Sequence, residues 1–130
     1  PGEDMLCLLP KDPDASAERI REAIRQRTGH TVAVVISDTF GRPWREGTTD
    51  IAIGTAGMDP LKDYRGEADS YGRTLRVSVA AIADEITGAA ELVTGKNQSI
   101  PVTLVRGFRY EDSTGGAETL IRDASMDMFR

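Results

Sequence analysis

The 130-residue sequence contains few of the residues that build disulfides, zinc sites and acyl-enzyme active sites. It has one cysteine, one histidine and 5% aromatic residues. A lone cysteine forms neither an intrachain disulfide nor a cysteine-based zinc site, so we expect Cys7 to be a small core residue of a strand. His30 follows the end of an expected helix, where a surface or capping role is typical. A Ser-His-Asp or Cys-His apparatus is therefore not expected within the chain.

Long apolar runs, basic tracts and common phosphate-binding motifs are also missing. No apolar run approaches the roughly 18 residues that span a bilayer, and no signal peptide is visible, so we expect a cytoplasmic protein. The chain has 16 basic and 21 acidic residues and a net charge of -5, which gives little support to binding of nucleic acid or a membrane surface. Neither GxxxxGK(S/T) nor GxGxxG occurs. Catalysis by such a chain would depend on metal ions, positioning and electrostatics, which fits phosphoryl chemistry better than acyl-enzyme chemistry.

The residues that are present predict a single α+β domain over residues 1–130. Hydrophobic residues make up 39% and charged residues 28%, as in soluble globular domains. Periodicity and capping residues predict one helix that begins near Asp14 or Ser16 and ends at Gly29, and a second over 80–94. Apolar or alternating segments predict strands at 5–9, 32–36, 50–58, 74–79 and 102–105. We expect helices on one side of a mixed sheet, with the uniformly apolar 32–36 strand in its centre.

The expected central strand ends on an acid that needs a partner. In VAVVISDTFGRPWREG, residues 32–47, Ser37, Asp38 and Thr39 follow the apolar run. An unpaired buried carboxylate loses several kcal/mol of hydration. Arg42 or Arg45 can supply a salt bridge, and a turn cap is a related structural role. Alternatively, the Asp38 carboxylate and the Thr39 hydroxyl can face two neighbouring divalent cations, because Mg²⁺ and Mn²⁺ prefer oxygen ligands. The residues alone leave these alternatives open.

Three loops carry side chains suited to anionic ligands. After the central strand, glycines allow close approach of backbone N–H groups, and Arg42 and Arg45 can bind phosphate or carboxylate oxygens in a fork. The second loop, 63–73, combines acids with arginines and tyrosines. The third, TGKNQSIP at 94–101, offers donors and amide oxygens for a phosphate or the edge of a base. A solvated loop with weak ion pairs and an ordinary helix-to-strand turn are the structural alternatives for the second and third loops.

Five segments together resemble a known enzyme family. They are LLPKDPDASAERIR, VVISDTFGRPWREGTTDIAIGTAGM, DYRGEADSYGR, AIADEITGAAELVTGK and PVTLVRGF. They occur in the same order, and at nearly the same spacing, as in the coenzyme F420-0:L-glutamate ligases, the F420 γ-glutamyl ligase family. The resemblance extends from about Leu6 to Phe129, and SDTFGRPWR is its most specific part.

The resemblance implies a GTP-dependent amide-bond ligase of coenzyme F420 biosynthesis. Such enzymes join L-glutamate to the lactyl carboxylate of coenzyme F420-0 and then add further glutamates through γ-linkages. GTP is the co-substrate, Mg²⁺ or Mn²⁺ is the cofactor, and K⁺ is a further candidate cation. The expected route phosphorylates the carboxylate, and the glutamate amine then attacks the acyl phosphate. The family fold is α+β and forms an intertwined homodimer with active sites near the interface.

The resemblance also assigns candidate site residues. Asp38 and Thr39 fall on the Asp-Thr pair of a two-metal site. Arg42 and Arg45 join Asp38 as catalytic candidates, and the arginines considered for binding phosphate or the glutamate carboxylate are Arg42, Arg45, Arg65 and Arg73. The nucleotide-binding loop maps to Thr94, Gly95, Lys96, Asn97, Gln98, Ser99, Ile100 and Pro101. Some relatives have an acid or amide that helps to hold a metal at the position of Lys96, which we expect to contact phosphate instead.

The sequence departs from the family because a large upstream portion is missing from these 130 residues. In the family this portion carries another metal-binding acid, in an AG-acid-xSN motif, and further nucleotide-contacting residues. We therefore expect the chain alone to bind nucleotide weakly or to be inactive. Two other functions remain open: a non-catalytic dimerisation or assembly module derived from the fold, and a metal-dependent phosphohydrolase that uses Asp38.

Overall fold

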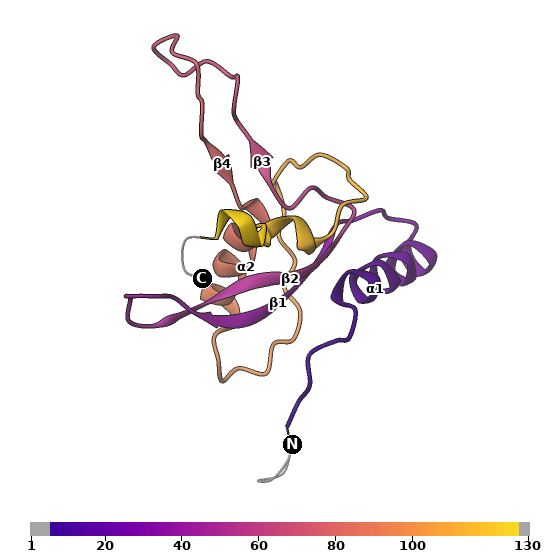
Figure 1. Cartoon of the computed structure of the whole chain (residues 1–130). Coiled ribbons are helices and arrows are strands. Elements are labelled where there is room, and N and C mark those ends of the chain that lie inside the picture. The colour runs from indigo at the N-terminus through magenta and orange to yellow at the C-terminus, as the bar shows by residue number, and fades with distance from the viewer. Residues whose placement is uncertain (1–5, 128–130) are drawn as a thin grey trace.

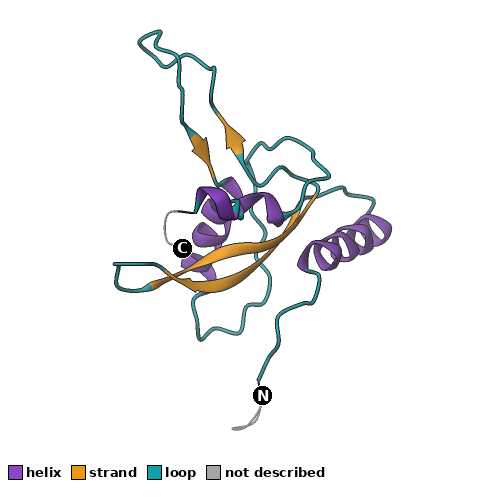
Figure 2. Ribbon diagram, viewed as in Figure 1, coloured by secondary structure: helices purple, strands orange, loops and turns teal. Residues whose placement is uncertain are grey.

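The computed structural model describes residues 6–127 and confirms the α+β class. Its elements are α1 (Pro13–Thr28), β1 (Val34–Gly41), β2 (Thr48–Ala56), β3 (Lys62–Asp63), β4 (Val79–Ala80), α2 (Ile82–Thr94) and the 3₁₀ helices η1 (Ala117–Leu120) and η2 (Ala124–Met126). Figures 1 and 2 show α1 and α2 beside the long β1–β2 hairpin, with the β3–β4 arm projecting away from it. Within the described residues, no helix is both long and apolar enough to cross a membrane.

Local sequence signals fix both ends of α1. Asp12 is the N-cap, and its carboxylate accepts a hydrogen bond from the Ala15 N–H at 2.8 Å. The expectation of a cap at Asp14 or Ser16 is therefore wrong by a few residues, because Pro13 occupies the first helical position, where its missing N–H costs nothing. Gly29 ends the helix in the left-handed conformation, with φ of 74°, as the sequence predicts.

The β1–β2 hairpin forms the centre of the molecule. The strands are antiparallel, with Asp38 opposite Ile51 and Gly41 opposite Thr48, and a register shift lies between Ile36 and Ser37. The expected strand at 50–58 is confirmed with slightly shifted bounds. The expected strand at 32–36 instead continues to Gly41, so Asp38 lies within the strand and not after it. The central position is also wrong: among residues 6–127, β1 pairs with β2 alone.

The second edge of β2 is occupied by carboxylates from the two α-helices. The Thr55 N–H donates to Asp14 of α1 at 2.7 Å, and the Ala52 N–H donates to Asp84 of α2 at 2.8 Å. Further along the same edge, the Asp50 N–H donates to Glu91 of α2 at 2.9 Å. Helical side chains thereby satisfy backbone donors that would otherwise require a neighbouring strand. This arrangement joins both helices to β2.

Small residues allow α1 and α2 to pack closely against the hairpin. A Cβ atom on Gly54 would lie 2.5 Å from the backbone carbon of Pro13, so only glycine permits this approach of α1. Ala17 of α1 and Ala83 of α2 are fully buried, and Met58 is 1% exposed. Burial of a side chain as large as Met58 contributes about 1.5–3 kcal/mol. Gly95 ends α2 as predicted, with its N–H bonded to the Glu91 carbonyl.

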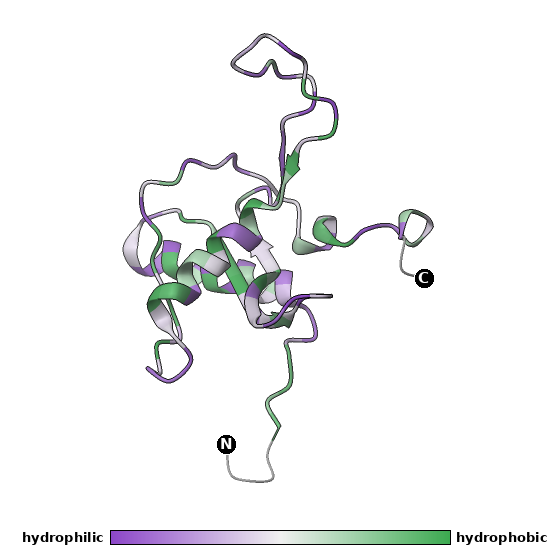
Figure 3. Cartoon of the chain, turned by 90° about the vertical axis from the view of Figure 1, so that its left-hand side faces the viewer, coloured by the Kyte–Doolittle hydropathy of each residue, from purple (hydrophilic) through white to green (hydrophobic). Residues whose placement is uncertain are grey.

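Two predicted strands do not form within the described residues. Of the segment 5–9, residue Met5 lies outside the described residues, and the rest is extended chain without a strand partner. Leu6 is 90% exposed and Cys7 is exposed, so the core role expected for Cys7 is wrong. The segment 102–105 likewise contains no strand, and Val102 is 79% exposed. Apolar sequence alone does not form a strand, because the backbone also needs a neighbouring edge to pair with. Figure 3 shows the apolar N-terminal segment standing away from the helices and the hairpin.

The β3–β4 arm replaces the strand expected at 74–79. Only Val79 and Ala80 pair with β3, and an isolated bridge joins Ala68 to Thr74 further out. The strands found in residues 6–127 therefore make two antiparallel two-stranded sheets instead of one mixed sheet. The arm directly precedes α2, so it lies at the opposite end of that helix from Lys96.

Candidate functional site

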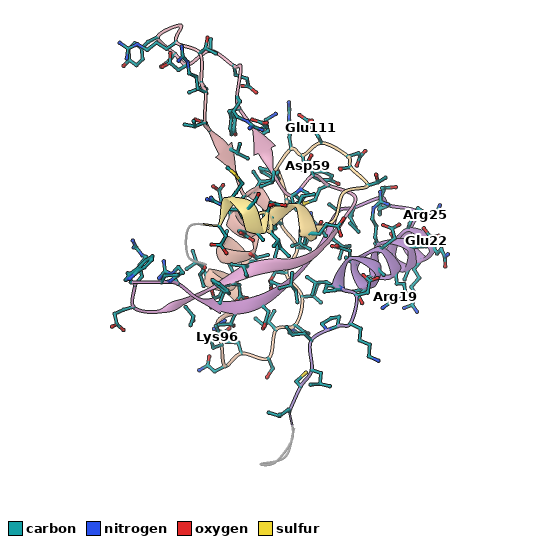
Figure 4. The ribbon with its side chains drawn as sticks, in the orientation of Figure 1. Arg19, Glu22, Arg25, Asp59, Lys96 and Glu111 are labelled. Carbon is teal, nitrogen blue, oxygen red and sulfur yellow. The ribbon has the colours of Figure 1, made fainter. Side chains whose placement is uncertain are left out.

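Five polar residues meet where β1, β2 and the end of α2 come together; we call them the Lys96 cluster. The cluster consists of Ser37, Thr39, Asp50, Glu91 and Lys96. The Lys96 ammonium lies 2.6 Å from Glu91 Oε1, 2.7 Å from Asp50 Oδ1 and 2.7 Å from Thr39 Oγ1. Thr39 and Ser37 also donate to the two Asp50 oxygens, at 3.2 and 3.4 Å. Figure 4 shows Lys96 beneath the hairpin, at the far side of the molecule from the β3–β4 arm.

The local structure explains why these residues meet. Thr39 lies directly opposite Asp50 in the hairpin register. Ser37 is two residues before Thr39, so both hydroxyls project on the same face of the strand. Glu91 belongs to the last turn of α2, and Gly95 ends that helix, which lets Lys96 turn back toward the hairpin. Two candidates from the sequence, Thr39 and Lys96, are thereby brought into contact across 57 residues.

Mutual charge and partial burial stabilise the ionised forms in the cluster. The side chains of Asp50 and Glu91 are 19% and 20% exposed. Burial raises the pKa of the Asp50 carboxyl, but hydrogen bonds from Lys96, Thr39 and Ser37 outweigh this effect and hold the pKa below its ordinary value. Hydrogen bonds to Asp50 and Glu91 raise the pKa of Lys96. The lysine is therefore a cation, and Asp50 is an anion, over the whole physiological pH range.

Asp38 has a different environment from its neighbour Thr39. It is half-buried, and its side chain projects on the opposite face of β1 because successive residues of a strand alternate. Within residues 6–127, its carboxylate forms no hydrogen bond or ion pair. The expected salt bridge to Arg42 or Arg45 is therefore wrong. A half-buried carboxylate without a protein partner is instead suited to a cationic ligand.

Arg42 and Arg45 lie in the turn that joins β1 to β2. An Nη2 group of Arg42 donates to the Glu46 carbonyl at 3.0 Å, and its Nε is buried without a partner among the described residues. Arg45 is exposed, and its backbone N–H bonds to the Arg42 carbonyl at 3.4 Å. The same turn contains Trp44, whose φ of 56° is uncommon for a residue other than glycine. The structure therefore places both arginines just beyond the strand that carries Asp38.

The remaining candidate residues lie in two separate regions. Lys96 is the residue of loop 94–101 that joins the cluster, and residues 95–101 are all exposed. In the β3–β4 arm, the Arg65 guanidinium binds the Asp63 carboxylate at 2.9 and 3.0 Å, and these hydrogen bonds lower the pKa of Asp63 to about 2. Arg73 donates its backbone N–H to Asp69, also within the arm. The arm arginines are not brought to Asp38 or to Lys96.

The described residues contain no preformed cluster of metal ligands, so the expected two-cation site at Asp38 and Thr39 stays a prediction. Residues 6–127 contain no group of three or more acidic, histidine or cysteine side chains arranged to hold a metal ion. Asp38 alone fits Mg²⁺, which keeps several waters and is commonly bound by one or two carboxylates and substrate phosphates. The Thr39 hydroxyl faces the other way from Asp38 and contacts Lys96 and Asp50.

Comparison with known proteins decides the family. A sequence profile described as F420-0:Gamma-glutamyl ligase matches residues 1–107. The chain belongs to the F420-0:γ-glutamyl ligase family. It is 45% identical to the coenzyme F420:L-glutamate ligase of Methanothermobacter thermautotrophicus over 125 aligned residues. The aligned region covers 94% of the chain and 50% of that protein. The enzymes of the same name from Haloarcula marismortui and Methanocaldococcus jannaschii are each 45% identical, over 100% and 95% of the chain and 50% of their own lengths. The chain therefore spans about half the length of these curated relatives.

In this member of the γ-glutamyl ligase family, the structure adds three residues to the candidate site that sequence reasoning did not single out. Ser37, Asp50 and Glu91 complete the Lys96 cluster. A signal for Asp50 was available, since a hairpin closed after Gly41 pairs the start of the second strand with the segment that contains Thr39. Glu91 gave no such signal, because its contact depends on how α2 packs against β2.

Proposed function

We propose that this chain is a part of a ligase that joins L-glutamate to coenzyme F420-0, with GTP and a divalent cation, in coenzyme F420 biosynthesis. The observation that carries the proposal is the 45% identity, over at least 94% of the chain, to curated coenzyme F420:L-glutamate ligases. The match extends across β1, the turn after it and α2, which together carry the candidate site. The enzyme would act as a homodimer, with the remainder of the ligase supplied beyond these residues.

The proposed reaction proceeds through an activated carboxylate. The terminal phosphoryl group of GTP moves to a carboxylate oxygen of coenzyme F420-0, and GDP leaves. The amine of L-glutamate then attacks the acyl carbon, inorganic phosphate leaves, and the amine loses a proton. Both steps develop negative charge on phosphate oxygens, so the site must hold that charge in fixed positions. A bound Mg²⁺ or Mn²⁺ supplies charge neutralisation for these oxygens.

Asp38 and the turn after it are the parts of this chain that we assign to the anionic groups. Asp38 would bind the cation, because its half-buried carboxylate has no partner among the described residues. Arg42 and Arg45 would bind phosphate or carboxylate oxygens, since guanidinium groups match these anions in two-pronged geometry. Support for Arg42 comes from its buried Nε, which lacks an acceptor within residues 6–127.

The loop after α2 would contact the nucleotide. Its side chains beyond Lys96 are exposed and offer amide and hydroxyl groups at Asn97, Gln98 and Ser99. These groups can donate to phosphate or to the polar edge of the guanine base. Lys96 already contacts three oxygens of the protein, so we assign the nucleotide contacts to the other residues of the loop.

The test measures cation-dependent nucleotide binding on the complete ligase. Mn²⁺ with GDP should raise the melting temperature of the wild-type protein, and Asp38→Asn should abolish that increase while leaving the ligand-free melting temperature nearly unchanged. Glu46→Gln removes an exposed carboxylate from the same hairpin and serves as the matched control, which should retain the full increase. Mass spectrometry should detect glutamylated coenzyme F420-0 with wild type and Glu46→Gln but not with Asp38→Asn.

Three results would contradict the proposal. The first is an unchanged response to Mn²⁺ and GDP in Asp38→Asn, which would exclude Asp38 as the cation ligand. The second is release of phosphate from GTP without glutamate or coenzyme F420-0, at the rate seen with both, which would favour a phosphohydrolase. The third is a stable dimer of the complete protein that responds to neither ligand, which would favour an assembly module.

A further inference from the structure

We propose that the ammonium group of Lys96 occupies the position of a second divalent cation, so that each active site binds one divalent ion. This inference rests on the proposed function, because it concerns how many ions that site takes. Its starting point is the arrangement of the Lys96 cluster. Three oxygens from three different elements surround one nitrogen: Thr39 in β1, Asp50 in β2 and Glu91 in α2.

The contacts use the full hydrogen-bonding capacity of the lysine. An ammonium group has three N–H donors and no acceptor. The three oxygens lie 2.6, 2.7 and 2.7 Å from Nζ, within the range of charge-assisted hydrogen bonds. Each donor therefore has a protein acceptor. A phosphate contact, which the sequence alone led us to expect for Lys96, would require breaking one of these bonds.

The ammonium and a divalent ion exclude one another at this position. Oxygen ligands lie about 2.0–2.1 Å from Mg²⁺ and about 2.3–2.6 Å from Ca²⁺, so the three oxygens, now 2.6–2.7 Å from Nζ, would need to move inward by a few tenths of an ångström to bind a divalent ion at the same point. The same carboxylates and hydroxyl would serve either cation. The side chains of Asp50 and Glu91 are about four-fifths buried, whereas that of Lys96 is 54% exposed, so two mostly buried negative charges lie close together beside a solvent-exposed cation. A resident cation is needed there, and Lys96 provides it.

Asp38 remains available for the one exchangeable ion. Its side chain projects on the opposite face of β1 from Thr39, and among residues 6–127 no cationic side chain contacts it. The hairpin thus separates two cation positions: a fixed one filled by Lys96, and one at Asp38 that a metal ion can enter. Removal of the Lys96 charge should open the first position to a divalent ion.

The experiment counts Mn²⁺ ions bound per chain in the complete ligase with saturating GDP, by electron paramagnetic resonance of free Mn²⁺. Wild type should bind one ion through this chain, and Lys96→Gln and Lys96→Met should each bind one ion more. Lys96→Arg keeps the positive charge and should not gain an ion. Lys62→Gln removes a lysine from an exposed ion pair with Glu111, at 3.1 Å, and should equal wild type.

The outcomes separate this inference from the proposed function. Two exchangeable ions at Asp38 and the cluster in wild type would overturn the inference, and so would Lys96→Gln and Lys96→Met variants that gain no ion while melting cooperatively. Asp38→Asn tests the proposed function independently, since it should lose one ion in both the wild-type and the Lys96→Gln backgrounds. A gain in Lys96→Gln that is unaffected by Asp38→Asn would support the role of Lys96 and refute the cation site at Asp38.

Discussion

Asp14 provides a sharp test of how α1 is held against the hairpin. Its Oδ1 oxygen accepts the Thr55 N–H at 2.7 Å and the Ala117 N–H at 2.9 Å, so one atom joins α1, β2 and η1. Thr55 is 2% exposed and Ala117 is 5% exposed, which leaves little room for water to replace the carboxylate. Asp14→Ala should therefore leave two backbone donors without an acceptor.

The expected loss of stability follows from these two bonds. A hydrogen bond to a charged group contributes about 1.5–3 kcal/mol, and an unsatisfied buried donor costs about 1–3 kcal/mol. Because both bonds share one oxygen, we use the lower part of these ranges and expect Asp14→Ala to lower the free energy of unfolding by about 3–5 kcal/mol. Asp14→Asn retains an oxygen that can accept both bonds and loses only the charge, so its cost should be about 1–2 kcal/mol.

Urea unfolding, followed by circular dichroism, measures both variants. Asp12→Ala is the control, because it removes an exposed helix cap at the same end of α1 and should cost about 1 kcal/mol. The reasoning would be refuted if Asp14→Ala differed from wild type by less than Asp12→Ala does. It would also be refuted if Asn proved as damaging as Ala, since that result would assign the effect to charge and not to the shared oxygen.

Two further predictions concern packing and pH. Gly54→Ala should lower the free energy of unfolding by about 1–3 kcal/mol, because its new methyl group would lie 2.5 Å from the Pro13 backbone carbon. Gly41→Ala is the control: its methyl group has open space and should change the free energy of unfolding little. Equal urea midpoints for the two variants would contradict this prediction. The folded-state pKa of Asp50 is below its ordinary value, so its pairing stabilises the protein above about pH 4, and that contribution is lost as the pH falls through the folded pKa. Asp50→Asn should therefore flatten the acid side of the stability curve, and an unchanged acid limb would exclude this role.

The elements that sequence predicted well are those with signals inside the element itself. The end of α1 at Gly29 and the end of α2 at Gly95 depend on local backbone conformation, which the residues encode directly. The strands expected at 5–9 and 102–105 depended on a neighbouring edge that no local pattern can reveal. The same limit explains the misplaced end of β1, since the strand continues as far as β2 pairs with it.

The candidate site divides in a similar way. Thr39 and Lys96 were both candidates from the sequence, but their direct contact depends on packing between segments 57 residues apart. Asp38 was singled out from the sequence, but its place inside β1 and its separation from Thr39 followed only once the strand was known to run through both residues. Chemistry carried by a residue type was thus predictable, and the direction of each side chain was not.

The β1–β2 hairpin has one closed side and one open side. Carboxylates from α1 and α2 bond the outward N–H groups of β2, so another strand cannot add there without displacing both helices. Among residues 6–127, β1 pairs with no strand other than β2. The sheet can therefore widen only alongside β1, and a polypeptide that pairs with that strand would run past Asp38 and remove it further from water.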